Sequence, residues 1–260
     1  LLESLQTFAS LGPLALSITP YLAAFGTQHK DEAVLRAFVK RFEISDALSL
    51  PNPRRAWITD TYDDVNGVAK TIKVLARGAS REGRDVTVLT CQATEPRQDT
   101  FKLVNFAPVG MFELPEYNQQ AIAFPPFLNV IEYLERGQFE EVIISTPGPL
   151  GLTALAAARL LGLKTTGIYH TDFPKYVEIL TDDEGLKQLT WRYMGWFYGQ
   201  VDRIFAPSDW YRRDLIQGGL EHKQIDVLPR GVDTDFFSPT KRVQDYWLRY
   251  NRNGDFKFLY

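Results

Sequence analysis

From residue 55 onward the chain alternates short apolar runs with longer amphipathic stretches. The short runs are rich in β-branched residues and predict buried strands at Ala56–Thr59, Val86–Leu89, Leu103–Phe106, Val142–Ser145, Thr165–Tyr169, Ile204–Ala206 and Ile225–Leu228. The longer stretches carry apolar residues at helical spacing and predict helices over Val68–Arg81, Phe127–Arg136, Leu150–Leu161, Leu186–Tyr198 and Tyr211–Gln217. Gly83, Gly162 and Gly218 are expected to end three of these helices.

Strands that alternate with helices require crossover connections, which are right-handed when they join parallel strands. Helices on both faces then cover a mostly parallel sheet. We therefore predict an α/β fold with a doubly wound, Rossmann-like sheet.

The first 50 residues follow a different pattern. Apolar residues recur there at helical spacing, at Leu5, Phe8, Leu11, Val34, Leu35, Phe38 and Phe42. Pro13 and Pro20 are expected breaks, and Pro51 and Pro53 a stiff joint. Residues 1–50 are thus a predicted helical segment, interpreted as the tail of an upstream domain.

Composition narrows the class of protein. The 260 residues are 45% apolar and 23% charged, which is ordinary for a globular chain, and the net charge of −3 gives no reason to expect a nucleic-acid partner. Cys91 is the only cysteine, which excludes an internal disulfide and a cysteine zinc cluster and fits a reducing, cytoplasmic setting. No apolar run is long enough to cross a bilayer, and the chain begins at Leu1 without a basic leader, so we expect no signal peptide and a fragment of a longer protein.

The predicted strand Thr165–Tyr169 ends in His170, Thr171 and Asp172, and we expect Pro174 to prevent further regular structure. In open α/β sheets ligands bind outside the carboxyl ends of the strands, so these side chains are placed to meet a substrate. The alternative is a hydrogen-bonded structural histidine, which is the commoner role of a histidine at a strand end.

The segment after the first strand reads TDTYDDVNGVAKTI, with Gly67 between strand and helix. A glycine there allows close backbone approach, and the free amides of the next helix favour an anion such as phosphate. The alternative is a plain tight turn. Because no G-x-G-x-x-G is present, dinucleotide binding is disfavoured. Asp60, Asp63 and Asp64 suggest either a metal site or, as we prefer, a turn and helix N-cap.

Three further stretches contain candidate ligand-binding residues. Gly148 lies in a glycine-rich turn between the fourth predicted strand and the helix that follows it, where close helix packing is the preferred explanation. Leu189–Arg203 holds several aromatic residues and Arg192, which form either a platform for sugars or bases or, as helical spacing favours, core. Arg230 opens the segment RGVDTDFFSP, either a site or an ordinary turn and linker.

Together these stretches resemble the N-terminal half of a family 4 glycosyltransferase of the GT-B fold, the group that includes bacterial mannosyltransferases and sulfolipid synthases. The matching motifs are DTYDDVNGVAKTI, STPGPLG, GIYHTDFPKY, APSDW and LPRGVDTDFFSP, in that order from Arg54 to about Arg242. Residues 1–50 are not covered. The resemblance implies a Rossmann-like domain at 54–238, and at 239–260 a linker with the first strand of a truncated C-terminal domain.

In that family two such domains face each other, with the acceptor mainly on the N-terminal one and the nucleotide-sugar mainly on the C-terminal one. The resemblance implies retaining transfer of a sugar from a UDP- or GDP-linked donor to a sugar or lipid hydroxyl, without an obligatory metal or other cofactor. It further implies a cytoplasmic protein, with peripheral contact at the inner face of a membrane, and a chain that folds but is inactive alone. Glu132 and Glu140 share the spacing of the family's C-terminal carboxylate pair, a match we attribute to chance.

The resemblance also assigns site residues. His170 is expected against the donor sugar near the reacting centre, where it positions the sugar and stabilises charge. Asp172 is expected to orient that ring or bind acceptor hydroxyls, and Lys175 to meet an anionic acceptor group. The other expected substrate-binding residues are Asn66, Gly67, Val68, Gly148, Tyr176 and Arg230. Alternatives are a non-catalytic module that binds sugars or phosphates and a nucleotide-sugar epimerase, while the sugar, base, acceptor and oligomeric state stay open.

Overall fold

The computed structural model describes residues 52–113, 121–221, 223–228 and 237–243, with isolated residues between 17 and 42 and at 234 and 246. The chain divides into two compact units, Leu1–Leu228 and Pro229–Tyr260. In the first unit the described residues from 17 to 41 are helical, including Pro20, which we expected to interrupt a helix. In the second unit the described element is a short 3-10 helix, η2 (Pro239–Lys241). The first strand of a C-terminal domain, which we expected at the end of 239–260, lies outside the described residues.

The first unit contains a seven-stranded sheet in the order β3-β2-β1-β6-β7-β8-β9, in which every neighbouring pair is parallel. The strands are β1 (Arg55–Ile58), β2 (Val86–Thr90), β3 (Lys102–Asn105), β6 (Glu141–Ile144), β7 (Lys164–Ile168), β8 (Arg203–Ala206) and β9 (Gln224–Val227). Each predicted strand is present, and no predicted boundary differs from the observed one by more than one residue. The predicted Rossmann-like fold is therefore confirmed.

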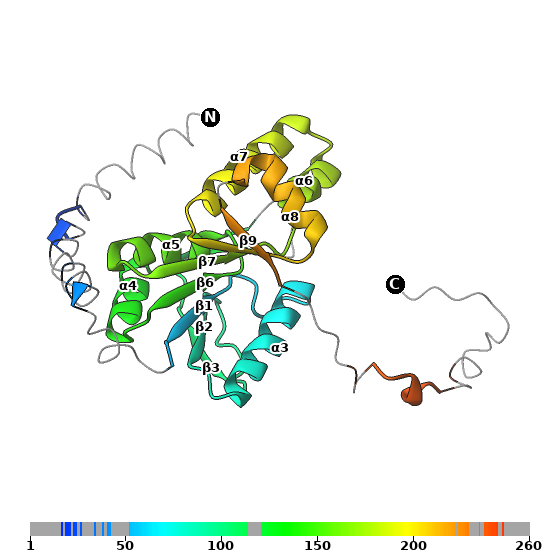
Figure 1. Cartoon of the computed structure of the whole chain (residues 1–260), viewed down its shortest axis with the longest axis horizontal. Helices are drawn as coiled ribbons and strands as arrows, with labels where there is room; N and C mark the ends of the chain where they lie inside the picture. The colour runs from blue at the N-terminus through cyan, green and yellow to red at the C-terminus, as the bar shows by residue number, and fades with distance from the viewer. Residues whose placement is uncertain are drawn as a thin grey trace. The chain divides into compact units, whose positions relative to one another are not determined.

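Helices connect these strands and lie on both sides of the sheet (Figure 1). They are α3 (Gly67–Arg81), α4 (Phe127–Arg136), α5 (Pro149–Leu161), α6 (Phe173–Thr181), α7 (Glu184–Gly199), α8 (Asp209–Leu215) and the π-helix η1 (Ile216–Leu220). Ile72 and Ala76 of α3 share one apolar cluster with Trp57 and Val88. The helices α4, α5 and α7 contribute to a second cluster, which includes the next side chain along β1, Ile58. The alternation along β1 thus directs successive side chains to opposite faces of the sheet.

Two features of the first unit were not predicted. The first is an antiparallel pair, β4 (Gly110–Glu113) with β5 (Ala121–Phe124), whose described apolar side chains include exposed Met111, Phe112 and Phe124. The second is α6, because Pro174 does not end regular structure but lies in the first helical turn, where its missing N–H needs no partner. A smaller correction concerns the stop at Gly218, since the residue with positive φ is Gly219, at 99°.

The start of α5 packs closely on the end of β6. A Cβ added at Gly151 would lie 2.0 Å from the carbonyl oxygen of Thr146 and 3.1 Å from Cγ2 of Ile144. A backbone atom cannot move aside as a flexible side chain does. This turn therefore needs glycine for close helix packing, as we inferred from the sequence.

Gly151→Ala is expected to lower the free energy of unfolding by about 2 to 3 kcal/mol, because the added methyl forces α5 away from β6. Gly195→Ala is the matched control in α7, where an added Cβ meets nothing within 4 Å. It is expected to raise the free energy of unfolding by about 0.4 to 1 kcal/mol. Urea unfolding of both variants tests the pair, and equal effects of the two substitutions would refute the packing argument.

The connection between β2 and β3 is tied to α3 by a bidentate ion pair. Nε and Nη2 of Arg77 donate to the two carboxylate oxygens of Asp99 at 2.9 and 2.7 Å, and the Thr100 amide donates to Asp99 at 2.7 Å. The hydrogen bonds from Arg77 are the main reason why the pKa of Asp99 falls from 3.8 to about 2. The folded protein therefore favours the ionised carboxylate more than the unfolded chain does.

Asp99→Asn is expected to lower the free energy of unfolding by about 1 to 2 kcal/mol at pH 7. Because the folded pKa lies below the unfolded one, this stabilisation is present above about pH 4 and is lost as the pH falls through about 2. The difference between wild type and variant should therefore shrink over that interval in pH-dependent denaturation. Glu82→Gln, which removes an exposed carboxylate 4.0 Å from Arg84, is the control and should have little effect at any pH.

Candidate functional site

Because the strands of the large sheet are parallel, the loops that follow them lie at the same edge of the sheet. The strand order reverses between β1 and β6, since β2 and β3 extend to one side and β7, β8 and β9 to the other. This reversal is the topological switch point at which open α/β sheets bind their ligands. The loops after β1 and β6 flank it, and the loop after β7, which carries His170, lies next to them.

Asp60 joins the first two of these loops. Its carboxylate accepts from Thr146 Oγ1 at 2.7 Å and from the Leu150 amide at 2.8 Å, at the start of α5. Burial is the largest influence on this carboxyl and raises its pKa, against those hydrogen bonds. A Cβ at Gly148 would lie 2.6 Å from Asp60 Oδ2, so the glycine makes room for the carboxylate. Asp60 thus serves the N-terminus of α5, and, contrary to our prediction, the N-cap of the following helix α3 is none of the three aspartates.

The cap of α3 is Asn66, whose Oδ1 accepts from the Ala69 amide at 2.9 Å. Gly67 follows as the first helical residue and is exposed, with nothing within 4 Å of the position where a Cβ would be. Val68 is half-buried and packs against the cluster around Trp57. The structure therefore gives Asn66 and Val68 structural contacts and leaves open space at Gly67, while ligand binding by all three stays a prediction.

His170 lies one residue beyond Tyr169, whose amide donates to the Phe205 carbonyl at 2.8 Å. Its Nε2 is 3.2 Å from Ser145 Oγ, directly after β6, and Ser145 Oγ accepts from Trp57 Nε1 of β1 at 2.7 Å. The half-buried imidazole is therefore held against the strands of the switch point. Its role toward a substrate stays a prediction.

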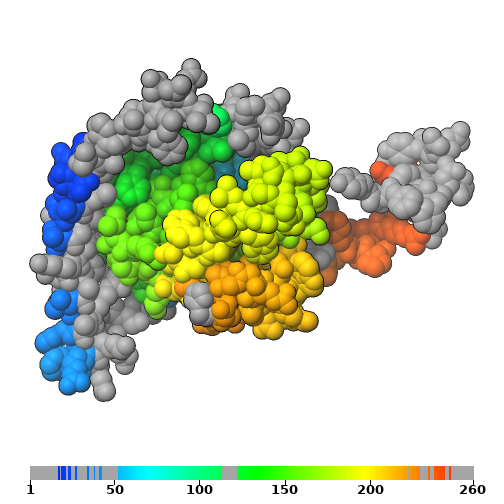
Figure 2. Space-filling model, turned by 90° about the horizontal axis from the view of Figure 1, so that it is seen from above, coloured from blue at the N-terminus to red at the C-terminus, as the bar shows by residue number. Residues whose placement is uncertain are grey.

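The other predicted residues of this segment belong to the start of α6. Asp172 caps that helix, since its Oδ1 accepts from the Lys175 amide at 3.2 Å. Lys175 and Tyr176 follow in the first turns and are exposed. Figure 2 shows α6 and α7 side by side at the surface. Exposed apolar side chains of these helices include Ile179 and Leu189. Arg230 lies outside the described residues.

Two other sequence interpretations can be compared with the structure. In the aromatic stretch, Phe197 and Tyr198 are fully buried, and Tyr198 donates from its hydroxyl to the Ile168 carbonyl at 3.1 Å, which confirms the core interpretation for them. Trp196 is exposed. Glu132 pairs with Arg136 on the surface of α4, and Glu140 precedes β6 at its amino end, so this pair is not at the edge that carries His170.

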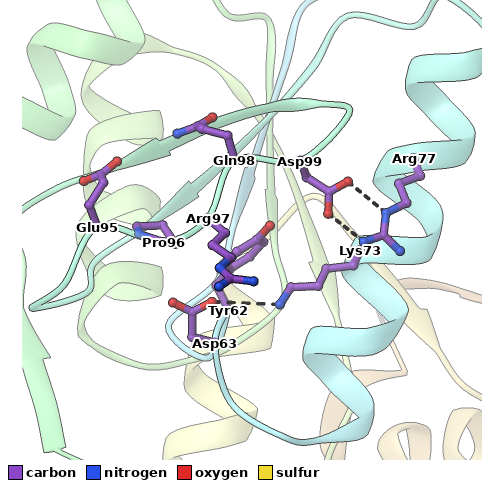
Figure 3. A pocket seen from close by; sticks show the side chains of 9 residues that line it. All are labelled: Tyr62, Asp63, Lys73, Arg77, Glu95, Pro96, Arg97, Gln98 and Asp99. Carbon is purple, nitrogen blue, oxygen red and sulfur yellow. Dashed lines mark hydrogen bonds and ion pairs between the residues drawn. The ribbon is translucent and has the colours of Figure 1, made fainter.

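A pocket of about 520 Å³ was not predicted (Figure 3). It lies between the loop after β1, the helix α3 and the β2–β3 connection, and it is lined by Tyr62, Asp63, Lys73, Arg77, Glu95, Pro96, Arg97, Gln98 and Asp99. Nζ of Lys73 is 4.3 Å from the centroid of the Tyr62 ring and 3.9 Å from Asp63 Oδ1. The sequence shows Lys73 and Arg77 at the i, i+4 spacing of one helix face. It does not show that the β2–β3 connection lies opposite them. Such a mixture of charged donors and acceptors can hydrogen-bond a polyhydroxylated ligand.

The described residues were also searched for a metal site and for a membrane span. They contain no group of three or more histidine, cysteine, aspartate or glutamate side chains that could hold a metal ion. Within the same part of the chain, no helix is long and apolar enough to cross a membrane.

Known proteins share this architecture and sequence pattern. The chain is 25% identical over 214 residues to a sulfoquinovosyl transferase of Arabidopsis thaliana, a match that covers 81% of the chain and 41% of the relative. It is 27% identical over 199 residues to a GDP-mannose-dependent alpha-mannosyltransferase of Mycobacterium tuberculosis, over 73% of the chain and 50% of the relative. The chain thus spans half or less of the length of these relatives.

Among solved structures, a sucrose-phosphate synthase of Thermosynechococcus elongatus superposes with a TM-score of 0.54 at 13% identity, over 77% of this chain and 53% of the other. This likeness supports the fold. The model of Glycosyltransferase Family 4 matches residues 65–236, a range that runs from the loop before α3 through His170 and beyond β9. The chain therefore belongs to Glycosyltransferase Family 4.

Proposed function

We propose that the full-length protein transfers a sugar from a UDP- or GDP-linked donor to a hydroxyl of a sugar or lipid acceptor, with retention of anomeric configuration. The observation that carries this proposal is the family match, because residues 65–236 include the loops after β6 and β7 and the N-terminus of α3, at the sheet edge where ligands bind. Both relatives named above are sugar transferases, which supports the same class of reaction.

Within this proposal the chain supplies mainly the acceptor side, through a domain at 54–238. Residues 239–260 would begin the domain that holds most of the donor, so we propose that residues 1–260 are inactive alone. The reaction needs no cofactor beyond the donor itself, and no metal is required in the proposal. We also propose a cytoplasmic protein with peripheral membrane contact, which the exposed apolar side chains of α6 and α7 support.

The residues at the sheet edge have distinct proposed roles. Cleavage of a nucleotide-sugar places negative charge on the departing diphosphate, and the free amides at the start of α3, beside Gly67, suit that charge. His170 would position the sugar and stabilise charge at the reacting centre. Asp172, Lys175 and Tyr176 would contact the acceptor, and Gly148 and Arg230 are each proposed to bind substrate.

A donor screen of the full-length protein tests the function. UDP- and GDP-linked sugars are incubated with candidate acceptors, and the release of nucleoside diphosphate is measured, followed by NMR determination of the product's anomeric configuration. We expect acceptor-dependent release, retention, and no turnover by residues 1–260 alone. Acceptor-independent epimerisation of a nucleotide-sugar would favour an epimerase, and ligand binding without turnover would favour a binding module.

In the same assay, His170→Ala is expected to lower kcat by at least about tenfold, which corresponds to about 1.4 kcal/mol of transition-state stabilisation. The fold should survive, because the half-buried ring lies at the end of a strand. Glu132→Ala, on the exposed surface of α4, is the control and should leave kcat unchanged. Unfolding of the histidine variant, or an unaltered kcat, would support a structural histidine.

Gly67→Val is expected to lower kcat/KM by about tenfold or more with little change in thermal stability. The reason is that the added side chain enters space that is empty in the structure and that a substrate would occupy. Gly67→Ala should have a smaller effect of the same kind. Gly78→Val in the same helix, where a Cβ also meets nothing within 4 Å, is the matched control. Kinetics unchanged by both Gly67 substitutions would favour the plain-turn interpretation.

A further inference from the structure

His170 contacts a hydroxyl group that is itself held by an indole. Its Nε2 lies 3.2 Å from Ser145 Oγ, and Trp57 Nε1 donates to that same oxygen at 2.7 Å. Ser145 is 2% exposed and Trp57 is 6% exposed. The three residues lie on β1, at the end of β6 and just beyond β7, which are neighbouring strands in the sheet.

The chemistry of these groups restricts which atom donates to which. An indole N–H can only donate, so Ser145 Oγ must accept from Trp57. A serine hydroxyl has a single hydrogen left to donate, and among the described residues the one further hydrogen-bonding neighbour of Oγ is His170 Nε2. If Oγ instead accepted from both neighbours, its hydrogen would be buried without an acceptor, which is unfavourable. The arrangement without an unpaired group has Ser145 donating to His170 Nε2.

We propose that Trp57 and Ser145 are positioning residues that hold the neutral imidazole of His170 in the tautomer with its proton on Nδ1. The indole fixes the direction of the Ser145 hydroxyl, and the hydroxyl then engages the lone pair of Nε2. This inference deepens the proposed function and rests on it for the catalytic meaning of His170. The tautomer assignment is argued from the hydrogen bonds of Ser145 Oγ and not from the proposed reaction.

The tautomer decides what His170 can do at the sheet edge. With Nε2 accepting from Ser145, the only N–H of the neutral ring is on Nδ1, and no free ring lone pair remains to remove a proton from an acceptor hydroxyl. The ring is thereby suited to donate a hydrogen bond to an oxygen and unsuited to act as a general base. Rotation of the ring would also break its bond to Ser145, so the same contact fixes its orientation.

Long-range 1H–15N correlation NMR of the histidine rings of the uniformly 15N-labelled chain tests the proposal, at a pH where the imidazole is neutral. The chain has three histidines, and His170→Ala identifies the resonances of interest. We expect wild type to show the proton of His170 on Nδ1. In Ser145→Ala and in Trp57→Phe, the population ratio of the Nδ1–H to the Nε2–H tautomer should fall by about fivefold to tenfold.

Matched variants separate this effect from general destabilisation. Ser208→Ala removes a hydroxyl at the same sheet edge, where Ser208 caps α8, and should leave the tautomer ratio unchanged. Ser145→Thr keeps a hydroxyl and should keep the ratio. Trp57→Phe keeps an aromatic ring in the core and therefore serves if Ser145→Ala does not fold. A wild-type His170 with its proton on Nε2, or a ratio unaltered in both Ser145→Ala and Trp57→Phe, would overturn the proposal.

Because the measurement uses no substrate, it is independent of the reaction catalysed. The expected tautomer in the chain, together with no transferase activity of the full-length protein, would contradict the proposed function and leave the positioning role intact. The opposite outcome, an active transferase with the Nε2–H tautomer, would overturn only the positioning role.

Discussion

The pairing of β1 with β6 is the constraint on which the rest of the first unit depends. These two strands join the halves of the sheet, with Ile58 opposite Ile144, and the Ser145 amide extends the ladder by donating to the Ile58 carbonyl at 3.0 Å. A shift of this register by one residue would turn Trp57 and Ile58 to the opposite faces. It would also separate Ser145 from Trp57, so the register that forms the two cores also assembles the contacts around His170.

The buried carboxylate of Asp60 shows how the loops at the switch point are kept in place. Burial opposes its ionisation, but the Thr146 hydroxyl and the amide at the start of α5 donate to it, and the positive end of a helix macrodipole favours an anion. Gly148 is required beside it because any side chain would occupy the volume of the carboxylate. The loops after β1 and β6 are thus joined by side-chain chemistry as well as by strand pairing.

The sequence was sufficient for the elements that carry strong local signals. Each strand of the large sheet is an apolar run, and the helices α3, α4, α5 and α7 follow apolar periodicity, so their positions could be predicted. The pair β4–β5 could not, because its strands expose Met111, Phe112 and Phe124 and, among their described side chains, lack the buried apolar residues of the large sheet. Pro174 is ambiguous by nature, since proline can begin a helix as well as end one, and the Asp172 cap that decides between the two depends on backbone geometry.

The candidate site was predictable only in part. A strand end that carries His170 can be identified locally, as can a glycine before a helix. The contacts that define the environment of His170 cannot, because Trp57 and Ser145 are 88 residues apart and Ser145 and His170 are 25 apart, and only the register of three strands brings them together. The pocket beside α3 could not be predicted for the same reason, since its lining comes from three segments separated in sequence.

Trp57 links the stability of the sheet to the chemistry of its edge. Its ring packs in the cluster with Ile72 and Val88, where a phenylalanine would also supply apolar surface, but only the indole brings a donor into that interior. A buried N–H needs an acceptor, and the one it has is the hydroxyl that contacts His170. The polar requirement of a core residue is therefore met at the sheet edge. A rearrangement of that core that moves Trp57 would therefore also change the hydrogen bond between Ser145 Oγ and the His170 imidazole.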